Sequence, residues 1–472
     1  MTTARRSLGP KPHTAHPHGP RSDARSIVAR INAMPVTPAH MKIVAVVALG
    51  LFFENYELFL TGALSSALQR DFAVSEEQMP AILGAGFFGA FVGAVALSRL
   101  ADRIGRRRAM ILTLSTFSLF SLAAAFAPNA PALIALRVLA GVGLGGELPI
   151  AVSYLGDLLP AARRGRWTAI AFTAAYLGVP AVGFLGAALV DRSPLGLAGW
   201  RWLFLIGGLG AALVWLARRN LPESPRWLAA MGRTEEAEQI VARLETSADP
   251  TRYAPTSAEA MPDTGSTSEI RHTFRDLLRR PLARRTTLMA GVSVLQAIGY
   301  YGFGSLAVLV LTQEGHSVVR SLAYTSVSYI GYPVGAAISA TVMERLERKW
   351  ILAGSAALMA VLGLGYANSA TPTAIMTLGF LYTLASNIMA NSYHIYQSEQ
   401  FPTAVRAGAD GALYSLSRLA SAAMPFVLVP LLHHTSPTLV VAVISAVMTG
   451  MVLLVLAFGV RTTGRSLEDI AD

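Results

Sequence analysis

The amino-acid sequence contains one pattern twice, and the two copies are separated by a constant distance. An acid and base pair is followed by an acid, proline and arginine block in each half, and 344 − 102 and 399 − 157 both equal 242. The recurring pairs are Asp102 with Glu344, Arg103 with Arg345, Arg106 with Arg348, Asp157 with Glu399, Pro160 with Pro402, Arg164 with Arg406, Gly89 with Gly331, and Gly93 with Gly335. Two copies in the same order indicate a duplicated architecture with two similar halves.

The composition places these halves in a membrane. Of the 472 residues, 53% are hydrophobic and only 14% are charged, whereas about 25% are charged in an ordinary soluble domain. The apolar residues form twelve runs, each long enough to cross about 30 Å of hydrocarbon as a helix. The runs are 41–68, 77–101, 107–128, 131–156, 165–190, 199–219, 285–312, 320–345, 349–369, 372–398, 407–432 and 437–460. We therefore predict an all-α membrane protein with two six-helix bundles, at 41–219 and 285–460.

The joining loops predict the orientation. Eleven basic residues lie in or beside the loops between spans 2–3, 4–5, 8–9 and 10–11, and four lie on the opposite side. By the positive-inside rule the first set is cytoplasmic, and an even number of spans then places both termini in the cytoplasm. The net charge of +11 is explained by this topology and by anionic lipid, so it requires no nucleic-acid partner.

Three segments stand apart from the spans. Residues 1–40 are rich in Arg, His and Pro and are predicted to be a disordered cytoplasmic tail, and residues 461–472 a second tail. The four histidines of the first tail could bind metal, but no helical spacing holds them together, so we expect no metal site. The segment 220–284 is predicted to be a cytoplasmic linker with one short helix at 234–244, capped by Thr234.

Several motifs resemble one family. Asp102-Arg-Ile-Gly105-Arg106-Arg107 is similar to the D-R-x-G-R-R loop of the major facilitator superfamily, although Ser98 stands where that motif usually begins with glycine. The runs Pro222-Glu-Ser-Pro225-Arg-Trp-Leu and Gly143-Leu-Gly-Gly-Glu-Leu-Pro149 resemble the metabolite and proton symporters related to sugar porters, in particular the organic-ion, synaptic-vesicle-glycoprotein-like and bacterial nicotinate-type branches. The resemblance implies a central cavity lined mainly by spans 1, 4, 7 and 10.

The repeated charges are predicted to act as a conformational latch. Acids near the cytoplasmic span ends lie within reach of loop arginines, and such pairs hold helix ends in one arrangement. A latch made in one conformation and broken in the other would set the balance between the two. The alternative is that the arginines only enforce topology. The predicted latch residues are Asp102, Arg106, Asp157, Arg164, Glu344, Arg348, Glu399 and Arg406.

Two carboxylates within span 1 are the candidate proton-coupling groups. Glu54 and Glu57 have i, i+3 spacing, which places them on one helix face. Ionisable groups near the centre of a membrane helix cost at least about 2.5 kcal/mol, so each is a candidate functional residue. Two carboxylates at low dielectric cannot both ionise cheaply, and one is expected to hold a proton near neutral pH. The alternative is that each is paired permanently with an arginine.

Arg137 and Glu147 of span 4 are the predicted partners of these carboxylates. Counted from the external ends of the spans, Arg137 lies ~9 Å deep, Glu57 ~16 Å, Glu54 ~21 Å and Glu147 ~24 Å. Glu147 is therefore nearly level with Glu54, and Arg137 lies above Glu57. An ion pair between Glu57 and Arg137 could replace a departing proton.

Span 11 gives the only indication of substrate charge. Arg418 lies about 17 Å deep, where an anion is its natural partner, and Arg418-x-x-Ser421-x-x-x-Pro425 resembles a stretch of organic-anion members of the organic-ion branch. The alternative is a structural salt bridge. Aromatic and polar side chains are predicted to complete the substrate site, namely Tyr56, Gln296, Tyr300, Tyr301 and His394. Gln296 falls at the position that corresponds to Glu54 in the repeat.

Three functions compete at this point. The first is import of a small organic anion, a monocarboxylate or aromatic acid, with protons by alternating access. The second is export, or proton-coupled transport of sugars or polyols, by the same fold, and the third is a non-transporting receptor or scaffold. No nucleophile elbow, metal-ligand cluster or phosphate loop supports an enzyme or a cofactor, and the glycines of Gly141–Gly146 predict close helix packing. The expected partners are the substrate, protons and the lipid bilayer, and the protein is expected to be a monomer.

Overall fold

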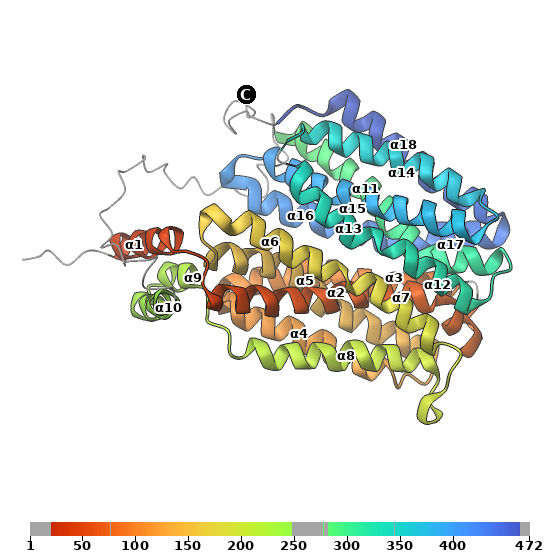
Figure 1. Cartoon of the computed structure of the whole chain (residues 1–472), viewed down its shortest axis with the longest axis horizontal. Helices are drawn as coiled ribbons and strands as arrows, with labels where there is room; N and C mark the ends of the chain where they lie inside the picture. The colour runs from red at the N-terminus through yellow and green to blue at the C-terminus, as the bar shows by residue number, and fades with distance from the viewer. Residues whose placement is uncertain (1–19, 76, 248–276, 278–281, 344, 463–472) are drawn as a thin grey trace, which may run out of the picture.

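A computed structural model describes residues 20–75, 77–247, 277, 282–343 and 345–462, and within this part of the chain every regular element is helical. The first half comprises α2 (Pro38–Asp71), α3 (Met79–Ile104), α4 (Arg106–Ala124), α5 (Ala130–Leu158), α6 (Ala161–Tyr176), α7 (Gly178–Leu189), the 3-10 turn η1 (Pro194–Gly196) and α8 (Gly199–Arg218). The second half comprises α11 (Leu282–Gln313), α12 (Val318–Tyr329), α13 (Gly331–Val342), α14 (Arg348–Ala367), α15 (Pro372–Glu399), α16 (Thr403–Ala423), α17 (Pro425–His434) and α18 (Pro437–Phe458). Figure 1 shows the two halves as neighbouring bundles of long, roughly parallel rods.

The twelve predicted spans correspond to the rods of these bundles. Ten helices among the described residues are long and apolar enough to cross a membrane, counting α6 with α7 and α16 with α17. The predicted spans 107–128 and 320–345 are occupied by α4 and by α12 with α13. The all-helical, two-bundle prediction is confirmed.

Local sequence signals explain where the rods begin. The side chain of Asn129 accepts a hydrogen bond from the backbone N–H of Ala132 at the start of α5, and Thr371 and Ser436 cap α15 and α18 in the same way. Proline occupies one of the first two positions of α2, α3, α5, α15 and α18, where its missing N–H costs no helical hydrogen bond.

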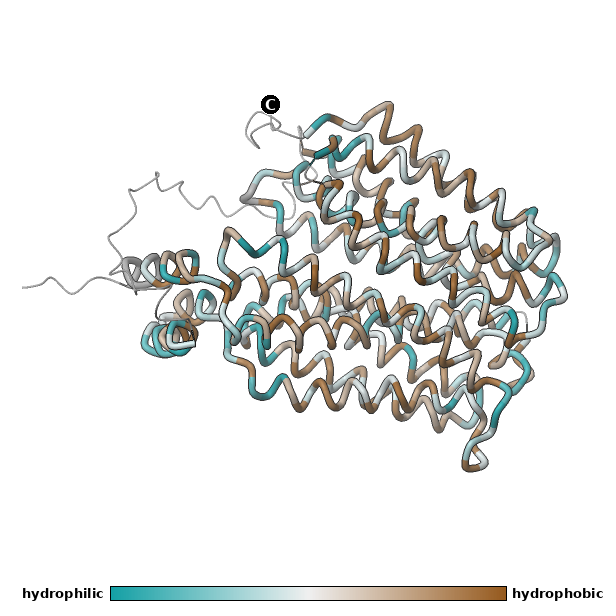
Figure 2. Tube along the Cα trace, in the orientation of Figure 1, coloured by the Kyte–Doolittle hydropathy of each residue, from teal (hydrophilic) through white to brown (hydrophobic). Residues whose placement is uncertain are grey.

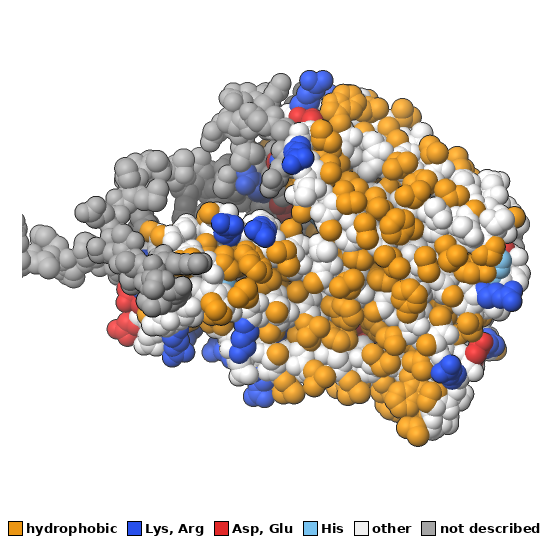
Figure 3. All heavy atoms as spheres, in the orientation of Figure 1, with side chains coloured by type: hydrophobic (Ala, Val, Ile, Leu, Met, Phe, Trp, Pro, Cys, Tyr) orange, Lys and Arg blue, Asp and Glu red, His pale blue; other side chains and the backbone are white. Residues whose placement is uncertain are grey.

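The outer surface is apolar around the bundles. Figure 2 shows hydrophobic residues along the full length of the rods and hydrophilic residues near their ends, and Figure 3 shows apolar side chains spread over the visible face. Large apolar side chains such as Leu119, Leu213 and Val361 are more than 60% exposed. A contiguous apolar surface of this kind suits lipid rather than water.

Close helix packing explains the glycine-rich segment of α5. A Cβ atom on Gly141 would collide with the backbone of Gly86, and one on Gly145 would collide with the backbone of Ala90, both on α3. On α3, Gly89 and Gly93 lie equally close to the backbone of α5. The predicted packing role of these glycines is confirmed, because larger side chains would push the two helices apart.

The two halves meet through α2 with α11, α3 with α16, α7 with α12, and α6 with α13. We call the end of the bundles that carries α1 (Pro20–Ala33), α9 (Pro225–Ala230) and α10 (Thr234–Thr246) the linker end, and the opposite end the far end (Figure 1). Toward the far end, Ser66 and Thr312 form a hydrogen bond of 3.1 Å between the halves, and Gly62 lies against the backbone of Ser305. In this conformation the two halves therefore contact each other closely toward the far end.

The prediction that residues 1–40 are disordered is wrong for residues 20–40, and residues 1–19 lie outside the described part. Helix α1 packs on α9 and α10, with Ile27 and Ile31 fully buried. Arg30 donates to both carboxylate oxygens of Glu245 at 3.0 and 2.6 Å. The apolar residues of α1 have helical spacing, but frequent charged residues separate them in the sequence.

The linker prediction needs one correction. A helix is present as predicted, but Thr234 is its first residue rather than its cap, and no side chain caps it. Ser224 instead caps the neighbouring helix α9 by accepting a hydrogen bond from the N–H of Trp227 at 3.1 Å. Three of the four histidines considered in the first tail lie outside the described residues. The fourth, His40, is buried in the cap of α2, where the Thr37 N–H donates to its Nδ1 at 3.1 Å.

Candidate functional site: buried charges between the two halves

Both predicted glutamates of α2 are buried, but they face different neighbours. Glu57 is fully buried, and its Oε2 accepts a hydrogen bond of 2.6 Å from Nη1 of Arg137 on α5. Nη2 of the same arginine donates to the Glu57 backbone carbonyl at 2.9 Å, and the Ser121 hydroxyl of α4 donates to the other carboxylate oxygen. The predicted contact between Glu57 and Arg137 is therefore confirmed.

Glu147 has a partner that sequence reasoning missed. Its Oε1 forms a fully buried ion pair with Arg218 at the end of α8, and its Oε2 accepts a hydrogen bond of 2.6 Å from Thr113 on α4. Gly50 of α2 makes room for the pair, because a Cβ at that position would collide with the Arg218 guanidinium. The sequence signal was an arginine in the last turn of a largely apolar span.

Breaking this pair from one side is expected to destabilise the protein. Arg218→Met leaves the Glu147 carboxylate buried beside a single hydroxyl, and loss of one partner of a buried ion pair costs about 3–5 kcal/mol. We expect a lower melting temperature in detergent for Arg218→Met, and a smaller loss when Glu147→Gln is added. Arg219→Met is the matched control, because Arg219 is exposed and stacks only on Trp215. Equal melting temperatures for Arg218→Met and the control would show that the pair contributes nothing to stability.

Glu54 is buried without a complete set of partners. It is 3% exposed, and its Oε2 has no hydrogen-bond partner. Arg418 of the second half interacts with it electrostatically, as do Arg218 and Glu147 of the first half. Unlike Glu57, this carboxylate lies between charges from both halves and is tied directly to none of them.

Arg418 of α16 is buried among tyrosines. It is 4% exposed, and it donates hydrogen bonds to the hydroxyls of Tyr301 at 2.5 Å and Tyr414 at 2.8 Å. Its guanidinium carbon also lies 5.1 Å and 4.6 Å from the centres of these two rings. Within the described residues, no carboxylate lies within 4.0 Å of its nitrogens, so the structural salt bridge considered from sequence is absent from this conformation.

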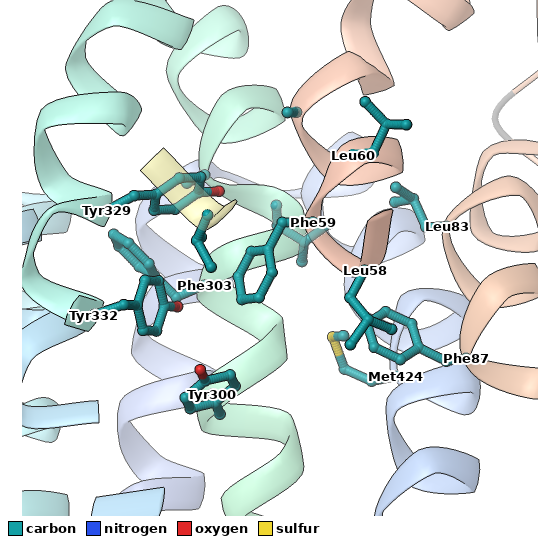
Figure 4. Close-up of a cluster of buried hydrophobic side chains, with 14 of the residues drawn as sticks. Leu58, Phe59, Leu60, Leu83, Phe87, Tyr300, Phe303, Tyr329, Tyr332 and Met424 are labelled. Carbon is teal, nitrogen blue, oxygen red and sulfur yellow. The ribbon is translucent and has the colours of Figure 1, made fainter. Parts of the chain in front are cut away.

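An aromatic cluster lies beside Arg418 where the halves meet. Phe59 of α2 packs against Tyr300, Tyr301 and Tyr332 of the second half, with ring centres 6.2, 6.1 and 5.3 Å away. Figure 4 shows Phe59 facing Tyr300 and Tyr332 from the opposite side of the interface. The predicted Tyr300 and Tyr301 are thus brought close to Arg418, since Tyr301 contacts both.

The other predicted substrate residues differ in whether the structure places them near Arg418. Tyr56 is 1% exposed and donates to the Leu203 carbonyl of α8 at 3.0 Å, so it packs within the first half and is not brought to Arg418. Gln296 is buried on α11, one helical turn before Tyr300. His394 of α15 is exposed and interacts electrostatically with Arg418.

Three further residues at this interface were missed from the sequence, namely Tyr176, Asn387 and Tyr414. Tyr176 ends α6 and lies next to Tyr300 and Asn387 of the second half. Uncharged polar residues inside apolar runs carry little signal of their own. The repeat could have identified Tyr176, because 418 − 176 equals 242.

The repeated charges at the linker end form matching pairs within each half. Arg106 lies 4.0 Å from Asp157, and the equivalent Arg348 lies 3.3 Å from Glu399. Arg106 also donates to Asp102 at 2.5 Å. These contacts join the helix ends of a single half.

In this conformation Arg164 interacts electrostatically with Asp157 but is hydrogen-bonded to backbone rather than to a carboxylate. Arg164 donates to the Leu159 carbonyl, at 3.4 Å from Nε and 3.3 Å from Nη2. Nε of the equivalent Arg406 donates to the Phe401 carbonyl at 3.2 Å. Each arginine thus caps the end of the preceding span, because those terminal carbonyls lack helical partners. Glu344 lies outside the described residues.

The site contains charges suited to binding and moving ions rather than to holding a metal. Across the described part of the chain, no group of three or more His, Asp and Glu side chains is placed to hold a metal ion. Among the described residues, the arrangement offers two carboxylates paired with arginines, one carboxylate with an oxygen that has no hydrogen-bond partner, and one arginine without a carboxylate partner. Such a set can exchange protons and bind an anion.

Comparison with known proteins identifies the family. The pattern of the sugar (and other) transporter family matches residues 43–472. The niacin transporter NiaP of Acinetobacter baylyi is 31% identical over 94% of this chain and 99% of its own length. The gallate transporter of Pseudomonas putida is 31% identical over 68% of this chain and 70% of its own length.

Solved structures agree on the fold. The proton:xylose symporter XylE bound to 6-bromo-6-deoxy-D-glucose superposes with a TM-score of 0.66 at 20% identity, covering 91% of this chain and 98% of XylE. A partially occluded inward-open conformation of XylE from E. coli gives a TM-score of 0.71, also at 20% identity, covering 90% and 99%. With twelve rods in two halves and a family match over nearly its full length, the chain belongs to the sugar (and other) transporter family of the major facilitator superfamily, and it is an integral membrane secondary transporter rather than an enzyme.

Proposed function

We propose that this transporter imports a small organic anion, a monocarboxylate or aromatic acid, together with protons. The observation that carries the proposal is Arg418, a guanidinium that is 4% exposed and has no carboxylate within 4.0 Å among the described residues. A buried cation costs free energy unless it is paired, and a substrate carboxylate can bind a guanidinium through two hydrogen bonds. Two relatives support an aromatic acid by their names, niacin transporter and gallate transporter.

Proton coupling is assigned to the glutamates of α2. A proton on Glu57 removes the charge that attracts Arg137 and weakens their ion pair, so protonation and the position of α2 against α5 are linked. Glu54 has a free oxygen and interacts with Arg418, so its charge responds to whatever binds there. An anion at Arg418 competes with Glu54 for the same cation, which favours the protonated form of Glu54.

The proposal includes orientation and conformation. The linker end faces the cytoplasm of the cell (inner or plasma) membrane, with both termini inside, because the basic loops gather there. The halves are hydrogen-bonded toward the far end, through Ser66 and Thr312, and the ion pairs of the linker end stay within single halves. The described conformation is accordingly the inward-facing one, and the protein acts as a monomer.

Uptake into proteoliposomes tests this function directly. With an imposed gradient, acid outside, we expect accumulation of radiolabelled aromatic carboxylates, and we expect a protonophore to abolish it. Xylose and a polyol form the second arm of the test. Accumulation of either of these without any carboxylate would replace the anion proposal by sugar or polyol transport. Accumulation of carboxylate that ignores the pH gradient would remove the proton coupling alone.

A further inference from the structure

The repeat places a tyrosine opposite the anion-binding arginine. Tyr176 stands in the first half at the position that Arg418 occupies in the second. It ends α6, and α7 begins two residues later at Gly178, whose missing side chain lets α7 lie against the Phe52 carbonyl of α2. The break between α6 and α7 therefore holds Tyr176 at the interface, where it is half-buried and next to Tyr300 and Asn387.

Asn387 supplies an unpaired hydrogen-bond donor at the same place. The residue is 0% exposed on α15, and it lies near the Tyr176 side chain, but its Nδ2 makes no complete hydrogen bond to a described residue. Its Oδ1 is occupied, because Asn391 donates to it at 2.9 Å, and Asn391 is itself held by Ser339 at 3.0 Å. Because Asn391 fixes the Asn387 carbonyl oxygen, the N–H₂ group of the amide points away from Asn391. A buried donor left without an acceptor is unusual, and it costs free energy until an acceptor arrives.

Two tyrosine rings separate this donor from Arg418. Arg418 donates to Tyr301 at 2.5 Å, the rings of Tyr301 and Tyr300 lie 4.7 Å apart, and Tyr300 neighbours Tyr176. Arg418 and Asn387 thus lie on either side of two tyrosine rings that meet edge to face. Aromatic side chains favour stacked or edge-to-face contact with another ring.

We infer that Tyr176 and Asn387 form a second recognition point, which donates a hydrogen bond to a ring nitrogen or ring hydroxyl oxygen of an aromatic acid whose carboxylate binds Arg418. This inference rests on the proposed function and narrows its substrate class. It divides recognition between the halves, since Tyr176 comes from the first and Asn387 and Arg418 from the second. An aromatic acid with a ring acceptor satisfies both points, and an unsubstituted one satisfies only the charge.

Equilibrium binding to the purified full-length protein tests the inference, using radiolabelled benzoate and competition by other acids. The competitors are 3-hydroxybenzoate, 4-hydroxybenzoate and nicotinate, which carry a ring acceptor, and 4-methylbenzoate, which matches the size of 4-hydroxybenzoate without one. We expect at least one acceptor-bearing acid to bind about tenfold more tightly than benzoate and 4-methylbenzoate, the effect of one buried hydrogen bond.

Two substitutions test whether Asn387 and Tyr176 cause the preference for acids with a ring acceptor. Asn387→Leu keeps the side-chain size and removes the donor, so the preference should disappear while benzoate affinity stays the same. Tyr176→Phe should reduce the preference in the same direction, and it provides the test if Asn387→Leu fails to fold. Asn368→Leu is the matched control, because Asn368 is exposed and bonds only locally to Leu364.

The outcomes separate the inference from the proposed function. Equal affinities for all acids in the wild type, or an equal loss of benzoate and substituted acids in Asn387→Leu, would overturn the second recognition point but leave anion transport standing. Absence of benzoate binding to a folded wild-type protein would instead contradict the proposed function.

Discussion

Replacing Arg418 by alanine is expected to remove carboxylate binding almost completely while leaving the protein folded. The guanidinium is the buried positive charge beside the tyrosines of the interface, and its partners there are two hydroxyls rather than a carboxylate. Truncation of one partner in a buried charged contact costs about 2–5 kcal/mol, which corresponds to a loss of affinity of about 30-fold or more. Arg418→Lys keeps the charge but not the planar fork, so it should bind carboxylates with intermediate affinity.

The control for this experiment is Arg137→Ala. Arg137 contacts a carboxylate directly in the structure, so its loss should leave Glu57 buried and unpaired and should lower the melting temperature strongly. Arg418→Ala should lower it much less, because no carboxylate is directly bonded to Arg418. If Arg418→Ala proved as unstable as Arg137→Ala but bound carboxylates with unchanged affinity, Arg418 would be a structural residue outside the substrate site.

The fold could be predicted from sequence because the bilayer limits the alternatives. A run of about 20 apolar residues has to form a helix in hydrocarbon, where backbone groups find no water. The repeat then added the division into two halves. Helix α1 was missed because no bilayer requires it to be helical. Its stability depends on burying Ile27 and Ile31 against α9 and α10, and a local sequence rich in charged residues does not reveal that contact.

The candidate site was predictable where charges lie in apolar surroundings. Depth counting along ideal helices placed Arg137 above Glu57 and suggested an ion pair, and the structure contains that pair. The same count placed Glu147 level with Glu54 but could not identify Arg218, which reaches Glu147 only because α8 packs beside α4 and Gly50 leaves space. Depth alone does not specify which faces of two helices meet.

The direction in which each side chain leaves its helix explains the remaining differences between the sequence predictions and the structure. Tyr56 lies two residues from Glu54 on α2, and that offset turns it toward Leu203 of α8 instead of toward the second half. Arg164 lies close in sequence to Asp157, but the nearer terminal carbonyl of Leu159 takes its hydrogen bonds. Glu54 and Glu57 share a face only approximately, and a rotation of about 300° over three residues is enough to give them different partners.

The second large effect is expected at Glu57. Glu57→Gln removes the charge that Arg137 and Ser121 hold and prevents the residue from carrying a proton, so accumulation of substrate against a gradient should be abolished. Exchange of internal for external substrate should survive, because exchange needs no net proton movement. Accumulation driven by pH and counterflow in proteoliposomes measure the two activities separately. Glu314→Gln is the matched control, because Glu314 is exposed beyond the end of α11 and should leave both activities unchanged.

Glu54→Gln gives the decisive comparison, because Glu54 differs from Glu57 in having an oxygen without a partner and a neighbouring cation in the other half. A glutamine there cannot compete with the substrate anion for Arg418 as a carboxylate does, so anion affinity should rise or stay constant while its dependence on pH weakens. Glu57→Gln should keep that pH dependence of binding and lose only the coupling of movement to protons. The double variant Glu54→Gln with Glu57→Gln should lose both the pH dependence of anion binding and the coupling of transport to protons. Accumulation driven by pH equal to wild type in that double variant would show that the protons cross elsewhere.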